Sequence, residues 1–198
     1  MFHQKFCHWL LLACLAIPVH AQPAVVVTLS TVGDRVRAQN PELAAARLRW
    51  PNEILCGSRK LAGLIIEQPA SGQLIVGFGM NVLNEPWTDS PELSDTATRL
   101  ADWISPVPDL ETLTTGILEA LSEAHTQMLA GGMLAAIDEL NAHWTDPMPV
   151  EISLSSGGTV RGSFLGLAPN GHLQLLDHTG SIFLVEHPTV ERLRELEG

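Results

Sequence analysis

Apolar residues recur along this chain with two different spacings. Residues 48–55 are expected to form a short strand that runs into a turn at residues 56–58. The apolar runs at residues 61–67 and 74–79 are typical of buried strands, and the strand at 61–67 is expected to pair antiparallel with the strand at 48–55. Residues 110–141 instead place apolar side chains three or four positions apart, with an interruption at two glycines, which predicts two helices or one bent helix. A sheet with at least one covering helix makes α+β the expected fold class.

The apolar run near the N-terminus has two interpretations. Lys5 precedes it and small residues around Ala21 follow it, which is the arrangement of a secretory signal peptide cleaved before Gln22. Alternatively, residues 10–17 form a buried strand that ends at Pro18. The run is too short for a comfortable membrane span, which needs about 20 apolar residues. Composition leaves both the signal peptide and the strand open.

Two segments connect these elements. Residues 24–39 are expected to form a helix rich in β-branched residues, which ends at Asn40 and Pro41. Residues 84–108 combine prolines with many Asp, Ser and Thr residues, the composition of a surface loop with short helical turns.

The C-terminal part of the chain has the pattern of a small β-domain. Asp146 and Pro147 mark the expected boundary, which gives domains at residues 1–146 and 147–198. Beyond the boundary, apolar residues alternate with polar ones, and Asn170–Gly171 is the strongest hairpin signal in the chain. Four or five short strands in this length predict a barrel of SH3-like size.

Composition and charge narrow the classes of function. The chain has 198 residues, of which 45% are hydrophobic, enough for one medium and one small core. Its 11 basic and 22 acidic residues give a net charge of -11, which argues against binding nucleic acid or an anionic membrane. The three cysteines and eight histidines lack the spacing of a disulfide framework or a zinc site, so no metal site is predicted.

Three short strings follow one another in the predicted sheet. They are R-W-P-N-E-I-L at residues 49–55, R-K-L-A-G-L-I-I-E at residues 59–67 and G-F-G-M-N-V at residues 77–82. The third string lacks the third glycine of a dinucleotide-binding fingerprint, which excludes a Rossmann site. Taken singly, each string has an ordinary structural explanation as a turn, a strand end or a surface lysine.

The residue types in these strings also suit a ligand. Lys60 opens a buried strand, where its stem can lie along apolar surface while its ammonium points at an anion. Gly63 removes a side chain from a strand interior, where a ligand or backbone can approach closely. Gly77 and Gly79 would let a planar group lie against the backbone, with the Asn81 amide at its polar edge.

The order and spacing of the three strings resemble the catalytic domains of biotin protein ligases. That family carries K/R-W-P-N-D, then R-K-L/V-A/G-G-I-L-I-E, then G-I/F-G-I-N-V, and residues 95–100 look like its A-T-S-L segment. The resemblance runs from about Arg49 to the C-terminus. It implies part of a class II synthetase-like mixed sheet with helices, followed by a small SH3-like β-barrel.

The resemblance also implies an activity. Members of the family join the carboxylate of biotin to the α-phosphate of ATP, and a lysine of a biotin carboxyl carrier domain then attacks the biotinyl-5'-AMP. Lys60 matches the family's catalytic lysine. The expected biotin-binding residues are Lys60, Gly63, Gly77 and Gly79. The expected nucleotide-binding residues are Asn52, Glu53, Asn81 and Ala97. ATP, biotin and Mg²⁺ are the implied cofactors, nucleic acid and membrane are not expected partners, and a homodimer stays open.

Two departures from the family pattern bear on this expectation. Glu53 stands where the family usually has Asp, and one extra methylene shifts a carboxylate by more than a bond length. The family's G-R-G-R-x-G-R loop does not occur in the sequence, so the chain is expected to be an N-terminally shortened member with Met1 inside the fold. Because an ATP-using ligase makes little sense outside the cell, a cytoplasmic ligase is the first expectation. The alternative is a non-catalytic binding module that kept the fold, exported if residues 1–21 are a signal peptide.

Overall fold

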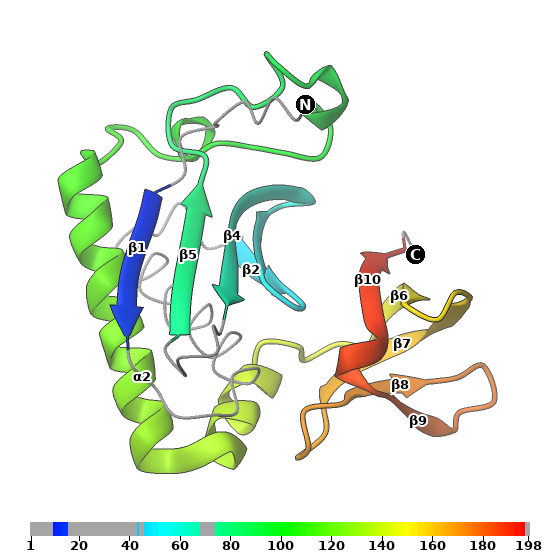
Figure 1. Cartoon of the computed structure of the whole chain (residues 1–198). Coiled ribbons are helices and arrows are strands. Elements are labelled where there is room, and N and C mark those ends of the chain that lie inside the picture. The colour runs from blue at the N-terminus through cyan, green and yellow to red at the C-terminus, as the bar shows by residue number, and fades with distance from the viewer. Residues whose placement is uncertain (1–9, 16–42, 44–45, 68–73, 197–198) are drawn as a thin grey trace.

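A computed structural model describes residues 10–15, 43, 46–67 and 74–196 of the chain. The helix expected at residues 24–39 lies outside the described residues. The described strands form two five-stranded sheets, joined by one long helix (Figure 1).

The first sheet contains the N-terminal strands in the order β1-β5-β4-β3-β2. Its strands are β1 (Leu10–Leu15), β2 (Ala46–Arg49), β3 (Glu53–Cys56), β4 (Arg59–Glu67) and β5 (Leu74–Met80). Neighbouring strands pair antiparallel. One isolated parallel bridge joins the start of β4 to Ala97, so the sheet is mixed at that point. The strand interpretation of the N-terminal apolar run is confirmed for the residues of β1.

The single strand expected at residues 48–55 is wrong. The structure has two strands there, β2 and β3, which form a hairpin with its turn at Trp50, Pro51 and Asn52. Proline has no amide hydrogen to donate to a neighbouring strand, so it suits the turn better than a strand interior. The two strands predicted after this hairpin are confirmed as β4 and β5, with β4 beginning at Arg59.

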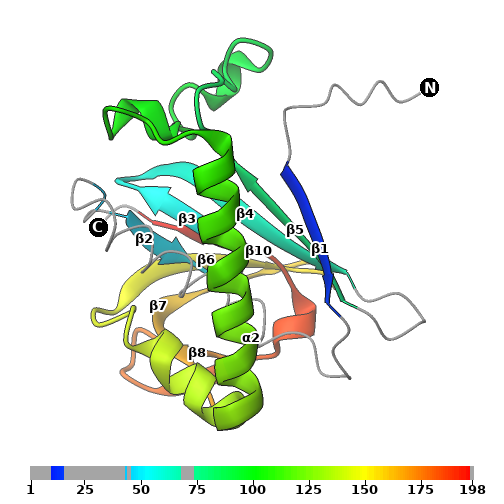
Figure 2. The same ribbon diagram turned by 90° about the vertical axis from the view of Figure 1, so that its left-hand side faces the viewer.

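Helix α2 (Leu110–Asn141) runs along one face of the first sheet (Figure 2). The Asp109 carboxylate caps its N-terminus by accepting a hydrogen bond from the Thr112 amide at 2.7 Å. Gly132 has φ 70° and ψ −174°, which interrupts the helix and confirms the bend that was predicted at the glycines. Among the described helices, none is both long and apolar enough to cross a membrane.

A hydrophobic core fills the space between α2 and the first sheet. Leu64 and Phe78 project from β4 and β5 into it and are almost fully buried, as are Leu121 and Leu140 of α2. The segment between β5 and α2 is a loop with two short helical turns, η2 (Pro91–Leu93) and η3 (Leu100–Asp102), as its composition predicted.

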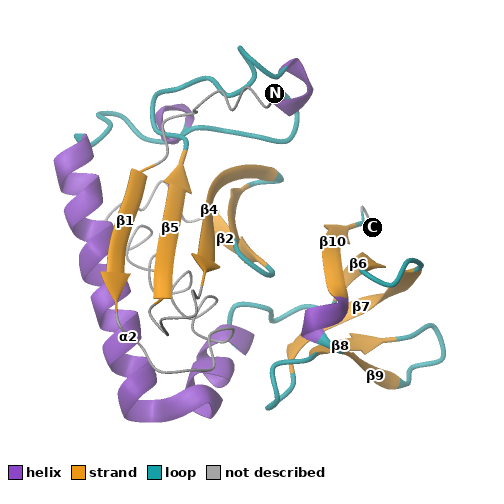
Figure 3. Ribbon diagram, viewed as in Figure 1, coloured by secondary structure: helices purple, strands orange, loops and turns teal. Residues whose placement is uncertain are grey.

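The second sheet is built from the C-terminal strands in the order β10-β6-β7-β8-β9 (Figure 3). Its strands are β6 (Met148–Leu154), β7 (Thr159–Leu167), β8 (Leu173–Leu176), β9 (Ile182–Val185) and β10 (Val190–Glu195), with the short turn η4 (His187–Thr189) before β10. All four pairings are antiparallel. This arrangement is consistent with the SH3-like barrel expected from the hairpin pattern.

The second sheet contacts the β2–β3 hairpin of the first. Arg47 of β2 donates two hydrogen bonds to the Glu195 carboxylate of β10, at 2.7 and 2.5 Å. The Trp50 ring in the hairpin turn packs edge-on against His187, with ring centroids 5.5 Å apart. These contacts hold the hairpin from outside its own sheet, and the hairpin carries two charged residues of the candidate site.

Candidate functional site

The candidate site is built on one row of residues that crosses four strands of the first sheet. Arg49 of β2 pairs with Glu53 of β3, Glu53 pairs with Gly63 of β4, and Gly63 pairs with Gly79 of β5. Side chains directly opposite each other on paired strands project to the same face of a sheet. The four residues therefore share one face, which is opposite to the core face because their chain neighbours, such as Leu64, point into the core.

This face of the sheet is open at Gly77 of β5 and Ile65 of β4, whereas Gly63 and Gly79 are buried. Gly77 lies on the same face as Gly79, two residues along the strand, and pairs with Ile65. Ile65 is 54% exposed, an unusual value for an isoleucine in the middle of a central strand. A Cβ placed on Gly77 would meet nothing closer than the Ile65 carbonyl oxygen at 3.9 Å. The face is therefore flat and open here, which suits a planar ligand.

Lys60 lies over Gly63. A Cβ on Gly63 would come within 3.2 Å of Lys60 Cε and 3.3 Å of Nζ, closer than most Cβ contacts in proteins. The sequence led us to expect that Gly63 makes room for a ligand, whereas the space above it is taken by the lysine itself. The glycine thus lets the lysine stem bend across the sheet surface toward β3.

Glu53 holds the ammonium in this position. Its Oε1 lies 2.7 Å from Lys60 Nζ, and its Oε2 accepts hydrogen bonds from Nε, at 2.7 Å, and Nη2 of Arg49. Burial alone would raise the pKa of Glu53, but the hydrogen bonds and charges of Lys60 and Arg49 outweigh it and lower the pKa. Two cations and one carboxylate therefore leave one net positive charge at the site, and the Lys60 side chain remains 41% exposed.

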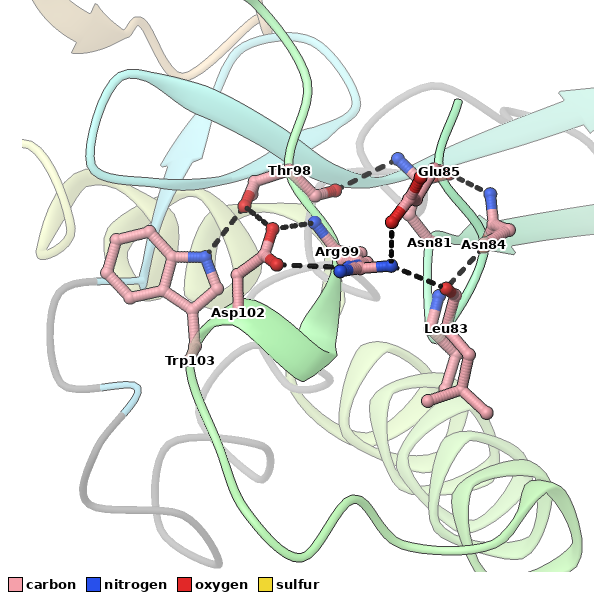
Figure 4. Close-up of polar contacts among 9 residues, drawn as sticks. Asn81, Leu83, Asn84, Glu85, Thr98, Arg99, Asp102 and Trp103 are labelled. Carbon is pink, nitrogen blue, oxygen red and sulfur yellow. Dashed lines mark hydrogen bonds and ion pairs between the residues drawn. The ribbon is translucent and has the colours of Figure 1, made fainter. Parts of the chain in front are cut away.

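The two asparagines of the motifs hold strand ends together. Asn52 donates from Nδ2 to the Leu64 carbonyl at 2.7 Å, and its own carbonyl accepts from the Leu64 amide at 3.0 Å. Asn81 donates from Nδ2 to the Thr98 carbonyl at 3.0 Å, and its Oδ1 accepts from Asn84 at 3.2 Å (Figure 4). Contact of Asn52 or Asn81 with a nucleotide stays a prediction.

Ala97 is brought beside Lys60 by the parallel bridge. The Lys60 amide donates to the Thr96 carbonyl at 2.8 Å, and the Thr98 amide donates to the Lys60 carbonyl at 2.9 Å. Ala97 itself is buried. Sequence reasoning placed both residues in the site but missed their adjacency, and it missed Thr98 altogether. The signal that could have found Thr98 is its place in the string that resembles A-T-S-L.

Other chemistries find no support in the described part of the chain. Burial raises the pKa of the Cys56 thiol to about 11, so it is protonated and a poor nucleophile at neutral pH. No group of three or more His, Cys, Asp or Glu residues there is arranged to hold a metal ion. The arrangement is suited to binding an anion beside a flat apolar group.

No protein-family model matches the chain. A curated relative does: the biotin–[acetyl-CoA-carboxylase] ligase of Mycobacterium tuberculosis strain H37Rv is 29% identical over 151 residues. The alignment covers 76% of this chain and 54% of the relative. The chain thus spans about half the length of the curated relative that it matches.

Solved structures show the same fold. The biotin protein ligase of Aquifex aeolicus in complex with biotin and ATP superimposes with a TM-score of 0.76 and 22% identity, covering 92% of this chain and 76% of that chain. The apo form of that ligase gives a TM-score of 0.75 and 20% identity, covering 88% and 76%. A biotin protein ligase-like protein of unknown function from Silicibacter gives 0.65 and 16%, covering 87% and 75%. The expected fold is therefore confirmed.

Proposed function

This chain is related in sequence to a biotin protein ligase and has the fold of that family, and on this premise we propose that it biotinylates a carrier-protein lysine at the expense of ATP. The intermediate is biotinyl-5'-AMP. One observation carries the proposal: a lysine ammonium is held by Glu53 above Gly63, on the sheet face that is open at Gly77 and Ile65.

The first half-reaction requires a fixed cation. The carboxylate oxygen of biotin attacks the α-phosphorus of ATP, the bond from that phosphorus to the bridging oxygen breaks, and pyrophosphate leaves with the electron pair. Both reactants are anions, so a positive group that is in place beforehand stabilises the transition state more than one that must be reorganised. We propose Lys60 for this role. Mg²⁺ would enter the site bound to ATP, as Mg-ATP.

The remaining residues divide between the two ligands. Gly63, Gly77 and Gly79 form the surface on which we place the ring system of biotin, since they leave the sheet flat there. Asn52, Glu53, Asn81 and Ala97 are proposed for the nucleotide side. Glu53 must yield some of its contact with Lys60 when an anionic ligand arrives, because the same ammonium then faces two acceptors.

The second half-reaction transfers biotin to a protein. The neutral amine of the acceptor lysine attacks the carbonyl carbon of the mixed anhydride, AMP leaves with the electron pair, and the amide nitrogen loses a proton. We propose a biotin carboxyl carrier domain as the acceptor. The sheet face on which we place the adenylate is exposed at Ile65, which supports approach of an acceptor lysine from solvent.

The proposal is tested by titrating the purified chain with biotin and Mg-ATP while measuring heat and pyrophosphate release. We expect biotin-dependent pyrophosphate release in the native chain and none in Lys60→Ala. The variant should fold as the native chain does, because the Lys60 side chain is 41% exposed and contributes little to the core. Absence of pyrophosphate release from the folded native chain would refute the ligase proposal.

A second function is favoured by one observation. Lys60 is already paired with Glu53, and this glutamate occupies the position where biotin protein ligases usually have the shorter aspartate. A chain in which this pair does not open would bind biotin without activating it. Heat on adding biotin, with no pyrophosphate on adding Mg-ATP, is the result that would identify such a binding module.

We also propose a cytoplasmic location, since the reaction consumes ATP. Support comes from β1 (Leu10–Leu15), which pairs with β5 and would be lost if a signal peptidase cut after Ala21. The mass of the protein isolated from its native cell distinguishes the two cases. A mature chain that begins at Gln22 would contradict this location.

A further inference from the structure

Among the described residues, Thr98 is the one polar residue that is completely buried, with an exposed fraction of 0%. Its hydroxyl accepts a hydrogen bond from Trp103 Nε1 at 2.9 Å and donates one to Asp102 Oδ2 at 3.1 Å (Figure 4). A buried hydroxyl engaged as both donor and acceptor has one favourable rotamer, because any other rotamer leaves buried polar groups unpaired. The side chain of Thr98 is therefore fixed.

The backbone of Thr98 connects this fixed side chain to the candidate site. Its amide donates to the Lys60 carbonyl at 2.9 Å, and its carbonyl accepts from Asn81 Nδ2 at 3.0 Å. Two residues earlier, the Thr96 carbonyl accepts from the Lys60 amide at 2.8 Å. Both backbone groups of Lys60 and the side chain of Asn81 thus depend on where residues 96–98 lie.

A second layer of contacts holds Asp102. Its carboxylate accepts hydrogen bonds from the Arg99 amide at 3.3 Å and from Arg99 Nε at 3.0 Å. Arg99 also donates to the Leu83 carbonyl at 3.0 Å and to Glu85 at 2.9 Å, which ties the loop after β5 to the same network (Figure 4). The acceptor of the Thr98 hydroxyl is therefore itself held in place.

We propose that Thr98 is a positioning residue for Lys60 and Asn81, which acts through the backbone of residues 96–98 with Trp103 and Asp102 as its hydrogen-bond partners. The proposal rests on the ligase function proposed above. Lys60 needs such control because its side chain has four rotatable bonds. Its ammonium must also lie close over Gly63, where a built Cβ would be 3.3 Å from Nζ. A shift of the Lys60 backbone would change the direction in which the stem leaves β4.

The test compares Thr98→Val, which keeps the shape but removes the hydroxyl, with Thr98→Ser, which keeps the hydroxyl. Lys5 and Lys60 are the two lysines of the chain, so reductive ¹³C-methylation gives two lysine signals by NMR, and Lys60→Arg identifies that of Lys60. We expect Thr98→Val to shift the Lys60 signal and leave that of Lys5, and Thr98→Ser to resemble the native chain. This readout requires no ligase activity.

Kinetics on unmethylated protein provide the second readout. We expect kcat for pyrophosphate release to fall at least about tenfold in Thr98→Val and by less than about threefold in Thr98→Ser, with KM for biotin changed less than kcat, because misplacing a group by about 1 Å can cost about 100-fold in rate. The control is Ile152→Val, which trims a buried residue of the second sheet, away from the network. It should lower stability while leaving kcat and the Lys60 signal unchanged.

The outcomes separate a positioning role from a merely structural one. If Thr98→Val loses stability as Ile152→Val does, but keeps the native Lys60 signal and the native kcat, the proposal is overturned. If the native chain releases no pyrophosphate, the ligase function fails, and a shifted Lys60 signal still supports control of Lys60 by Thr98. Should Thr98→Val fail to fold, Trp103→Phe removes one of the two hydrogen bonds, and an unchanged Lys60 signal there also overturns the proposal.

Discussion

Replacing Gly63 tests the placement of the lysine most directly. A Cβ at this position would lie 3.2 Å from Lys60 Cε, 3.3 Å from Nζ and 3.5 Å from the Asn52 carbonyl oxygen. The two tight contacts are with the end of a flexible side chain, whereas the backbone contact is of ordinary length. We therefore expect the lysine to move and the sheet to stay, with Gly63→Ala causing a small displacement and Gly63→Val a larger one.

The expected effects on folding and on catalysis differ in size. Glycine in a strand interior is about 0.5–1 kcal/mol less favourable than alanine, so the stability of both variants should stay within about 1 kcal/mol of the native value. A valine branch forces the ammonium to move by roughly 1 Å, which weakens its 2.7 Å contact with Glu53. A displacement of this size can cost about 100-fold in kcat/KM, which corresponds to about 2.7 kcal/mol of transition-state stabilisation.

Three measurements decide the matter. Urea unfolding gives the stability of each variant, pyrophosphate release gives kcat/KM, and the ¹³C-methyl signal of Lys60 reports its position. Gly77→Ala is the matched control for the position of Lys60, because a Cβ there meets nothing closer than 3.9 Å and should leave the ¹³C-methyl signal of Lys60 in place. Native kcat/KM and a native Lys60 signal in folded Gly63→Val would refute the reasoning.

Three further predictions concern stability. The pKa of Glu53 is lower in the folded chain than its ordinary value of 4.5, so its contribution to stability is present above pH 4.5 and is lost as pH falls through the folded pKa. Glu53→Gln should lower stability at pH 7 by at most about 1 kcal/mol, since Lys60 is 41% exposed, and it should weaken the dependence of the urea midpoint on pH below 4.5. Asn141→Ala removes two hydrogen bonds to the backbone of Leu167, at 2.9 and 2.8 Å, and should cost about 1–3 kcal/mol by urea unfolding. Burial, followed by the charge of His172, lowers the pKa of His187 below its ordinary value of 6.5, so protonation favours the unfolded chain and stability should fall as pH drops below 6.5. The fall should be smaller in His187→Phe, and thermal melts at pH 5 and pH 7 would show the difference.

Much of the fold could be predicted because it depends on local pattern. The alternation in β6 (Met148–Leu154) and the turn at Asn170–Gly171 each specify a short piece of chain without reference to the rest. The bend in α2 (Leu110–Asn141) follows from its two adjacent glycines in the same way. The β2–β3 hairpin was missed because each of its strands has only four residues, and the apolar residues Leu48 and Leu55 on either side of the turn were assigned to one strand.

The candidate site was predicted as a set of residues but not as an arrangement. The three strings selected Lys60, Glu53, Gly63 and Gly79 through their order and spacing, and the register of β3, β4 and β5 brings these residues together. The sequence did not show that the lysine occupies the space above Gly63. That contact depends on a bend of the side chain, which residue spacing does not specify.

The sequence by itself determined most of the described strands and the bent helix α2, but not the β2–β3 hairpin, and it determined which residue types are available for binding an anion beside a flat group. Only the tertiary structure decided that Glu53 pairs with both Arg49 and Lys60, and that Thr98 lies buried against the backbone of Lys60. The physical reason is distance along the chain. Thr98 is 38 positions from Lys60, and hydrogen bonds across such a separation form only when two strand ends and a loop have been packed into one place.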